Sequence, residues 1–140
     1  RQRQMCIRDR LHGRVEELDW AKFLPGVFVI RVFHMTPDEE KNAPTLHDAL
    51  RPGYHHIILL DTATQGGQDG GSGVSFNWSH VSNIPVPFLI AGGLTPDNVQ
   101  EALTQSLAAG VDTSSGVETE GQKDTAKITA YVENARRVLS

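Results

Sequence analysis

The chain has 140 residues, of which 39% are hydrophobic and 21% are charged, and its formal net charge is −4 at pH 7. This composition is typical of one globular domain, and it lacks the basic excess of a nucleic-acid-binding protein. The apolar runs are too short to span a bilayer, no signal peptide is evident, and one cysteine can form neither an internal disulfide nor a cysteine metal cluster, so we expect a soluble cytoplasmic protein.

The first ten residues, RQRQMCIRDR, differ in composition from the rest of the chain. They contain four arginines and show no apolar periodicity. We therefore expect residues 1–10 to be a tail that is either disordered or foreign to the protein, and residues 11–140 to form the domain. Directly after them, Arg14 to Phe23 is predicted to be a helix with Val15 and Leu18 facing inward.

Apolar runs bounded by turn residues predict the strands. Strands are expected at Val27–Phe33, His55–Asp61, Pro87–Gly93 and, more weakly, within Gly110–Glu118. Strands that are apolar along nearly their whole length are buried on both faces, which is typical of a parallel sheet.

The segments between these strands have helical patterns. Thr36 and Glu39 form a capping-box pattern, but we expect Pro44 to interrupt that helix and a second short turn to begin near Thr45. In the next segment we expect Thr95 to be the N-cap, Pro96 the first helical residue and Gly110 the stop.

The last helix is predicted to begin after the cap Asp124 and to end with Arg136 and Arg137 in its final turn, where cations suit the helix dipole. Its expected apolar stripe consists of Ile128, Tyr131, Val132, Ala135 and Leu139. Alternation of strands and helices along the chain indicates an α/β fold.

Polar and glycine residues follow the predicted strands, at the ends where parallel sheets bind ligands. Asp61 precedes a glycine-rich loop, Gly92 and Gly93 end the next strand, and Ser114–Gly116 follow the last one. Separately, these are ordinary features, because an aspartate after a strand is often a turn residue and a glycine-rich loop is often a connector. Together, two successive strands that end in small residues with free backbone N–H groups indicate a phosphate site.

The six histidines give little evidence for a metal site. His55 and His56 are adjacent in a predicted strand, so their side chains point to opposite faces. His34, His47 and His80 are expected in solvated loop or helix positions. His12 ends the first strand-like piece and is expected at the same rim as Asp61.

Five motifs, in their order and spacing, resemble the later part of the phosphoribosylanthranilate isomerase family. The resemblance runs from Leu11 to Leu139, and its motifs are LHG (11–13), LLDT (59–62), GGSGVSFNW (70–78), IAGGLTPDNV (90–99) and GVDTSSGVETEGQKDTAKI (110–128). It implies an eight-stranded (β/α)8 TIM barrel from tryptophan biosynthesis, of which this chain would hold strands four to eight. A complete barrel needs about 200 residues or more, so we expect an incomplete barrel, a fragment without strands one to three.

The resemblance also implies an activity and a site. The family performs an Amadori rearrangement of N-(5-phosphoribosyl)anthranilate, a phosphosugar, and uses neither a metal nor an organic cofactor. Asp61 would be the general acid. The substrate and its phosphate would be bound by the other site residues, which are His12, Gly92, Gly93, Asp112, Ser114, Ser115 and Gly116.

Two departures from the family matter. Its general base is a cysteine on strand one, which is absent here, and Cys6 lacks the glycine that follows that cysteine in the family motif. We therefore expect the fragment alone to be inactive. Asn77 stands where the family commonly has an acidic residue, which should alter a local hydrogen bond.

Three alternatives stay open. The chain could belong to another phosphosugar-binding (β/α)8 enzyme, although the pairing of DTSSGVE with KDTAKI argues against this. It could be a non-catalytic phosphate-binding half-barrel that works through a partner. It could also be the C-terminal end of a protein in which the isomerase is fused to other tryptophan-pathway domains.

Overall fold

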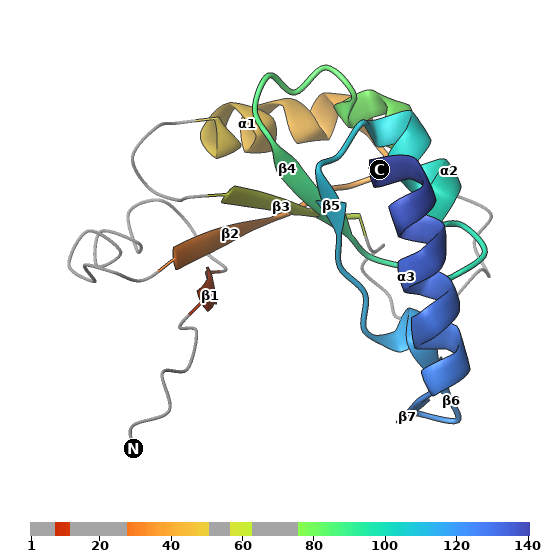
Figure 1. The fold of residues 1–140 in the computed structure, drawn as a ribbon. Helices are drawn as coiled ribbons and strands as arrows, with labels where there is room; N and C mark the ends of the chain where they lie inside the picture. Colours follow the sequence, from red (N-terminus) through yellow and green to blue (C-terminus); the bar gives the residue numbers. More distant parts are fainter. Residues whose placement is uncertain (1–7, 12–27, 51–56, 63–75) are drawn as a thin grey trace.

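The computed structural model describes residues 28–50, 57–62 and 76–140, and the backbone of residues 8–11. Its sheet contains β1 (Arg8–Leu11), β2 (Phe28–His34), β3 (Ile57–Asp61), β4 (Phe88–Ala91) and β5 (Gly110–Val111). Each strand pairs in parallel with the next one along the chain, so the spatial order equals the chain order (Figure 1). The predicted α/β fold with a parallel sheet is confirmed.

Several strand limits differ from those predicted. β2 begins and ends one residue later than expected, and β5 has two residues where a longer strand was expected within Gly110–Glu118. In place of a longer strand the chain forms a 3-10 helix, η3 (Ser115–Val117), and a small hairpin of β6 (Glu118–Thr119) and β7 (Gln122–Lys123). β1 starts before the predicted domain boundary, because Arg8–Arg10 pair with β2.

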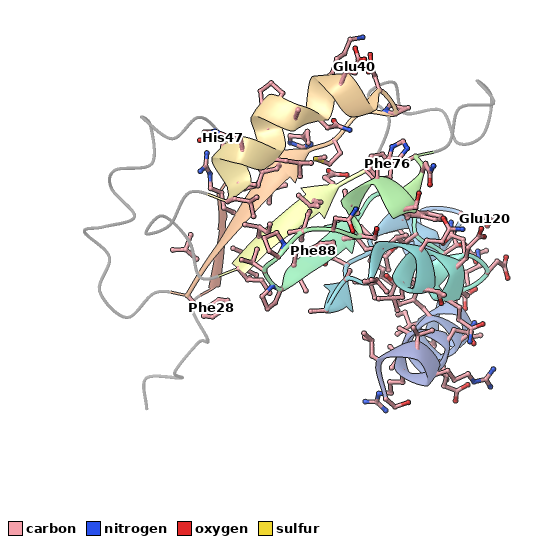
Figure 2. The ribbon with its side chains drawn as sticks, turned by 90° about the horizontal axis from the view of Figure 1, so that it is seen from above. Phe28, Glu40, His47, Phe76, Phe88 and Glu120 are labelled. Atoms are coloured by element: carbon pink, nitrogen blue, oxygen red, sulfur yellow. The ribbon has the colours of Figure 1, made fainter. Side chains whose placement is uncertain are left out.

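Apolar side chains cover both faces of the sheet. Along β2 and β3, Phe33 and Leu60 belong to a large buried cluster that includes residues of all three helices. Val32 and Leu59 alternate with them and belong to a second cluster on the opposite face, together with Ile30 and Ala91. Burial on both faces explains why these strands are apolar along nearly their whole length. Figure 2 shows Phe28 and Phe88 at the starts of β2 and β4, which run in the same direction.

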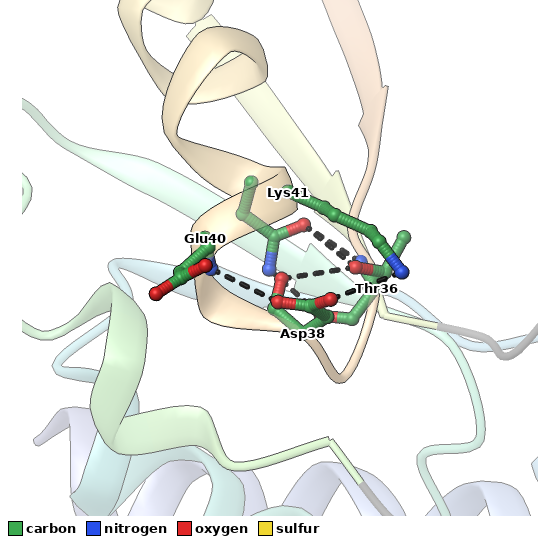
Figure 3. Close-up of polar contacts among 5 residues, drawn as sticks. Thr36, Asp38, Glu40 and Lys41 are labelled. Atoms are coloured by element: carbon green, nitrogen blue, oxygen red, sulfur yellow. Dashed lines mark hydrogen bonds and ion pairs between the residues drawn. The ribbon is translucent and has the colours of Figure 1, made fainter.

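Helix α1 (Glu39–Ala49) begins after Asp38, whose side chain accepts a hydrogen bond from the amide of Glu40 (Figure 3). The predicted capping box with Thr36 as N-cap is wrong. Asn42, which is 2% exposed, instead holds Thr36 by accepting from its amide at 2.8 Å and donating to its carbonyl at 2.7 Å. The nearby Lys41 side chain, through a hydrogen bond and its charge, lowers the pKa of Asp38.

Pro44 lies inside α1, so the predicted interruption and second start near Thr45 are wrong. Proline removes the backbone donor that would bond the carbonyl four residues earlier, which here belongs to Glu40. Glu40 and Pro44 are both exposed, so water can reach that carbonyl and the helix continues.

Helix α2 (Val99–Ser106) starts and ends at residues other than those predicted. Its N-cap is Asn98. The backbone carbonyl of Thr95 accepts hydrogen bonds from the amides of Asn98 and Val99. The helix ends at Ser106, and its C-cap Leu107 has a left-handed φ of 58°. The predicted stop, Gly110, belongs to β5, where an added Cβ would lie 2.7 Å from Leu89 Cδ2.

Helix α3 (Thr125–Leu139) begins as predicted, because Asp124 accepts hydrogen bonds from the amides of Ala126 and Lys127. Arg136 and Arg137 occupy its last turn, also as predicted. Only two of the five residues of the predicted apolar stripe are buried. Tyr131 and Ala135 are buried in the cluster against α2, whereas the remaining stripe residues, Ile128, Val132 and Leu139, are exposed.

One ion pair fastens α1 to the sheet. Arg31 on β2 is fully buried, and its Nη2 lies 2.9 Å from Asp48 Oδ2 on α1. Its guanidinium carbon also lies 4.5 Å from the centre of the Phe33 ring, a cation–π contact. Within the described ranges, none of the helices has the length and apolar character that crossing a membrane requires.

Candidate functional site

The strand register brings the predicted site residues to one edge of the sheet. Asp61 at the end of β3 pairs with Ala91 at the end of β4, and the amide of Asp112 donates to the carbonyl of Ile90 at 2.9 Å. The carboxyl ends of β3, β4 and β5 therefore coincide. Every predicted site residue that the structure describes is at or directly beyond this edge: Asp61, Gly92, Gly93, Asp112, Ser114, Ser115 and Gly116.

Asp61 lies on the face of the sheet opposite the helices. Side chains alternate along a strand, so Asp61 shares this face with Leu59, a member of the second cluster. Its carboxylate is 26% exposed, and Oδ2 lies 3.4 Å from Nδ1 of His34, the last residue of β2. A carboxyl group at this depth can still reach a ligand at the edge while it is partly shielded from water.

His34 is a site neighbour that the sequence did not reveal. We expected it in a solvated loop or helix position, but it ends β2 and pairs in register with Asp61. Its side chain is 51% exposed. The only signal in the sequence is its place directly after an apolar strand, which became informative once the parallel register was known.

Thr62 fixes the end of β3 against the glycines of the next loop. Its amide and its Oγ1 both donate to the carbonyl of Ala91, at 2.8 and 2.9 Å, and Oγ1 also contacts the carbonyl of Gly92 at 3.3 Å. Thr62 is 6% exposed, so these bonds are shielded from water. The bonds of Thr62 therefore fix the position of the preceding residue, Asp61, relative to the loop after β4.

The loop after β4 depends on its two glycines. Gly92 and Gly93 have φ values of 97° and 65°, in the left-handed region that favours glycine. Asn98 completes the turn by donating from Nδ2 to the carbonyl of Gly93 at 2.9 Å and by accepting from the amide of Thr95 at 2.8 Å. The sequence therefore needs glycine here for backbone geometry, independently of any ligand.

The loop after β5 packs directly on the loop after β4. Thr113 Oγ1 donates to the carbonyl of Leu94 at 2.7 Å. An added Cβ at Gly116 would lie 1.7 Å from the same oxygen, so only glycine permits this approach. The two glycine-bearing loops meet at the Leu94 carbonyl, and we call residues 92–94 and 113–116 together the cradle.

Asp112 directly precedes cradle residues 113–116, and its charge acts on Tyr131 of α3. Burial raises the pKa of the Tyr131 hydroxyl well above its usual range, and the negative charge of Asp112 raises it further. Tyr131 therefore stays protonated at all physiological pH values.

Asn77 has a structural role near this edge. Its Oδ1 accepts from the amide and the hydroxyl of Ser79 at 3.2 and 2.7 Å, and so caps the 3-10 helix η2 (Trp78–Val81). Its Nδ2 lies 3.2 Å from Nε2 of His80. A carboxylate could make the same cap but could only accept from His80, so the expected change in local hydrogen bonding is located at this contact.

Two predicted site elements fall outside the described residues, namely His12 and the glycine-rich loop after Thr62, and so does Cys6, which we had excluded from the site. Within the described part of the chain, no three His, Cys, Asp or Glu side chains are grouped to hold a metal ion. The described edge offers the Asp61 carboxyl group together with the backbone amides and serine hydroxyls of the two loops.

Comparisons with known proteins place this edge in context. The sequence model of a family described as N-(5'phosphoribosyl)anthranilate (PRA) isomerase matches residues 10–134. A multifunctional tryptophan biosynthesis protein of Schizosaccharomyces pombe is 43% identical over 123 residues, which are 88% of this chain and 15% of that protein. The N-(5'-phosphoribosyl)anthranilate isomerase of Wickerhamomyces anomalus is 38% identical over 130 residues, 90% of this chain and 51% of that enzyme.

A solved structure gives the same picture for the fold. The N-(5'-phosphoribosyl)anthranilate isomerase from Pyrococcus furiosus superposes with a TM-score of 0.70 at 26% identity, over 94% of this chain and 62% of the other. This chain thus spans about half to three fifths of the length of these two isomerases. Its parallel sheet corresponds to part of a (β/α)8 barrel, which confirms the predicted incomplete barrel.

Proposed function

Because this chain belongs to the N-(5'-phosphoribosyl)anthranilate isomerase family, we propose that it supplies the general acid and the phosphate site of an enzyme performing that Amadori rearrangement. One observation supports the proposal: the register pairs Asp61 with Ala91, directly before cradle residues 92–94, and β4 pairs on its other side with β5, which leads to cradle residues 113–116. Neighbouring strands are about 4.8 Å apart, so β3 and β5 are separated by roughly 10 Å, a distance that a pentose phosphate can span.

The reaction converts an aminoaldose into an aminoketose. Protonation of the ribose ring oxygen lets the bond between this oxygen and C1' break, while the anthranilate nitrogen donates its lone pair to form a protonated Schiff base. Removal of the proton from C2' then gives an enolamine, which becomes the ketone. In this proposal Asp61 donates the first proton, from a position where its carboxyl group is partly shielded and held beside His34.

The cradle would bind the phosphate. Backbone N–H groups at Gly92, Gly93, Ser115 and Gly116, with the hydroxyl of Ser114, are the type of donor set that holds phosphate groups without a metal. Asp112 would line the pocket between the two loops, and His12 would complete it. Such a site binds the substrate and the transition state through the same group, and so it orients the sugar for proton transfer.

The general base would come from sequence outside residues 11–140. These residues contain no cysteine, and the family motif for the base, as the resemblance implies, lies on the first strand of the barrel. We therefore propose that the 140-residue chain alone has no isomerase activity.

The test is to complete the barrel. Residues 11–140 would be joined to the preceding part of the Wickerhamomyces anomalus isomerase, giving what we call the completed barrel. We expect it to convert N-(5'-phosphoribosyl)anthranilate to the aminoketose, as followed by chromatography, whereas the chain alone should not. A folded completed barrel that binds inorganic phosphate without turnover would instead favour the non-catalytic half-barrel.

We also propose that the complete gene product is either a single-function isomerase or a fusion to other tryptophan-pathway domains. Both kinds of relative support this, since the Schizosaccharomyces pombe protein is multifunctional and the Wickerhamomyces anomalus protein carries the isomerase name alone. Sequencing upstream of Leu11 in the source transcript decides between them.

A further inference from the structure

We propose that Lys123 is a positioning residue that fixes Ser114 for phosphate binding. This inference rests on the phosphate site proposed above. Lys123 Nζ donates to the backbone carbonyl of Ser114 at 2.9 Å and to its Oγ at 3.1 Å. It therefore holds the main chain and the side chain of one cradle residue at the same time.

The hairpin explains how a lysine from beyond the cradle returns to it. Glu118 pairs with Lys123 across β6 and β7, and Glu120 and Gly121 form the turn, with φ values of 52° and 76°. The amide of Asp124 donates to the carbonyl of Val117 at 2.9 Å and closes the hairpin against η3. The backbone pairing of the hairpin therefore places Lys123 near Ser114 independently of the bonds that the lysine side chain makes.

The hydrogen-bond inventory of serine gives Lys123 a consequence for binding. An ammonium group can only donate, so the Ser114 Oγ must accept from it. The Ser114 hydroxyl hydrogen then remains available to donate in another direction, and Ser114 is exposed. An anion at the cradle would find this hydroxyl already oriented as a donor, with less entropy to lose on binding.

The ammonium charge itself is balanced locally. Lys123 Nζ also forms an ion pair with the carboxylate of Glu118, and the side chains of Lys123 and Glu118 are 54% and 24% exposed. Because a carboxylate accompanies the cation, the pair adds little net positive charge beside the cradle. The contribution of Lys123 is therefore one of position more than of charge.

Lys127 provides a matched control. Its Nζ donates to the carbonyl of Glu118 at 2.6 Å, so it anchors the same hairpin through a lysine side chain. Among the hydrogen bonds of the described residues, Ser114 is bonded by Lys123 and not by Lys127. A purely structural role for Lys123 would predict equal effects of removing either lysine.

The experiment measures inhibition of the completed barrel by inorganic phosphate, together with KM and kcat. Lys123→Met should raise both the Ki of phosphate and the KM up to about tenfold, because the Ser114 side chain must then be ordered by the ligand itself, with kcat nearly unchanged. Lys127→Met should leave Ki and KM near the parent values. Lys123→Arg, which keeps a cationic donor, should restore most of the affinity.

The outcomes separate this inference from the proposed function. A parent enzyme that is inhibited by phosphate, with Lys123→Met unchanged or Lys127→Met equally impaired, overturns the role of Lys123 alone. A parent that turns over without phosphate inhibition overturns the proposed phosphate site and this inference with it. If Lys123→Met does not fold, Ser114→Ala and Lys123→Arg replace it. The inference requires a raised Ki of phosphate in Ser114→Ala and a nearly normal Ki in Lys123→Arg. A normal Ki in Ser114→Ala, or a raised Ki in Lys123→Arg, contradicts it.

Discussion

Thr113 Oγ1 donates a hydrogen bond of 2.7 Å to the carbonyl of Leu94, and this bond joins the loop after β5 to the loop after β4. The same carbonyl would be 1.7 Å from a Cβ at Gly116. One backbone oxygen thus determines which residues can occupy two positions of the neighbouring loop. The proposed phosphate site is consequently a property of both loops together, and changes in either should affect binding and stability at once.

Asp61→Asn in the completed barrel should remove most turnover, because the amide keeps the shape of the side chain but cannot donate the proton that opens the ring. Folding should change little, since Asp61 is partly exposed and Thr62 makes the buried bonds to β4. Turnover at saturating substrate and a far-UV circular dichroism spectrum measure the two effects. Near-normal turnover would refute the acid assignment.

Gly116→Ala should lower the free energy of unfolding by about 1–3 kcal/mol or more, because the new methyl group forces the two loops apart. Urea unfolding of the completed barrel measures this cost, and the Ki of inorganic phosphate should rise in the same variant.

Gly93→Ala is the contrasting control, because its Cβ would have nothing within 4 Å but its φ is +65°. Here the cost should be about 1 kcal/mol and should come from the backbone conformation alone. Gly93→Asn should cost less than Gly93→Ala, since asparagine tolerates this conformation better. Equal costs for Gly116→Ala and Gly93→Ala would argue against the close approach of the loops.

Leu107→Gly should stabilise the protein by about 1 kcal/mol, because glycine adopts the left-handed conformation at the end of α2 without the penalty that a Cβ brings. Leu107 is 68% exposed, so little apolar burial is lost. Leu107→Ala keeps the Cβ and should give no such gain. The urea midpoints of the two variants check this, and a gain in both would point to the removal of an exposed apolar side chain.

Acid should weaken the start of α3. The Thr119 hydroxyl has the largest effect in lowering the pKa of Asp124, followed by the amide of Lys127, with the amide of Ala126 contributing less. A carboxyl whose pKa is lowered by folding stabilises the protein above its unfolded pKa, near 3.9 for aspartate, and this stabilisation is lost as the pH falls through the lowered value.

Thr119→Val removes the largest of these causes, so the pKa of Asp124 should rise toward its unfolded value, and the loss of stability in acid should be smaller and complete at a higher pH. Asp124→Asn keeps an N-cap without a titrating group and should remove this part of the pH dependence. Helix content and urea midpoints of the completed barrel, measured from neutral pH to about pH 3, follow both variants. Identical acid transitions in the parent and Thr119→Val would contradict the assignment.

The amino-acid sequence by itself determined the parallel α/β sheet and the start of α3. Apolar runs such as Ile57–Leu60 are typical of parallel strands that are covered on both faces. Asp124 caps α3 by accepting hydrogen bonds from amides only two and three residues further along the chain. The glycines at 92 and 93 were also visible, because their backbone conformations are a local demand. Motif order then identified the family, which the family model confirmed.

Only the tertiary structure decided the contact of His34 with Asp61 and the approach of Gly116 to Leu94. The starts of α1 and α2 depend on bonds between residues that are close in the chain, Thr36 with Asn42 and Thr95 with Asn98, which the predicted capping patterns did not identify. The contacts of His34 with Asp61 and of Gly116 with Leu94 join residues of different strands or of the loops that follow them. Their partners depend on strand register and on the paths of two loops, which packing of the whole sheet sets and which no local pattern of residues records.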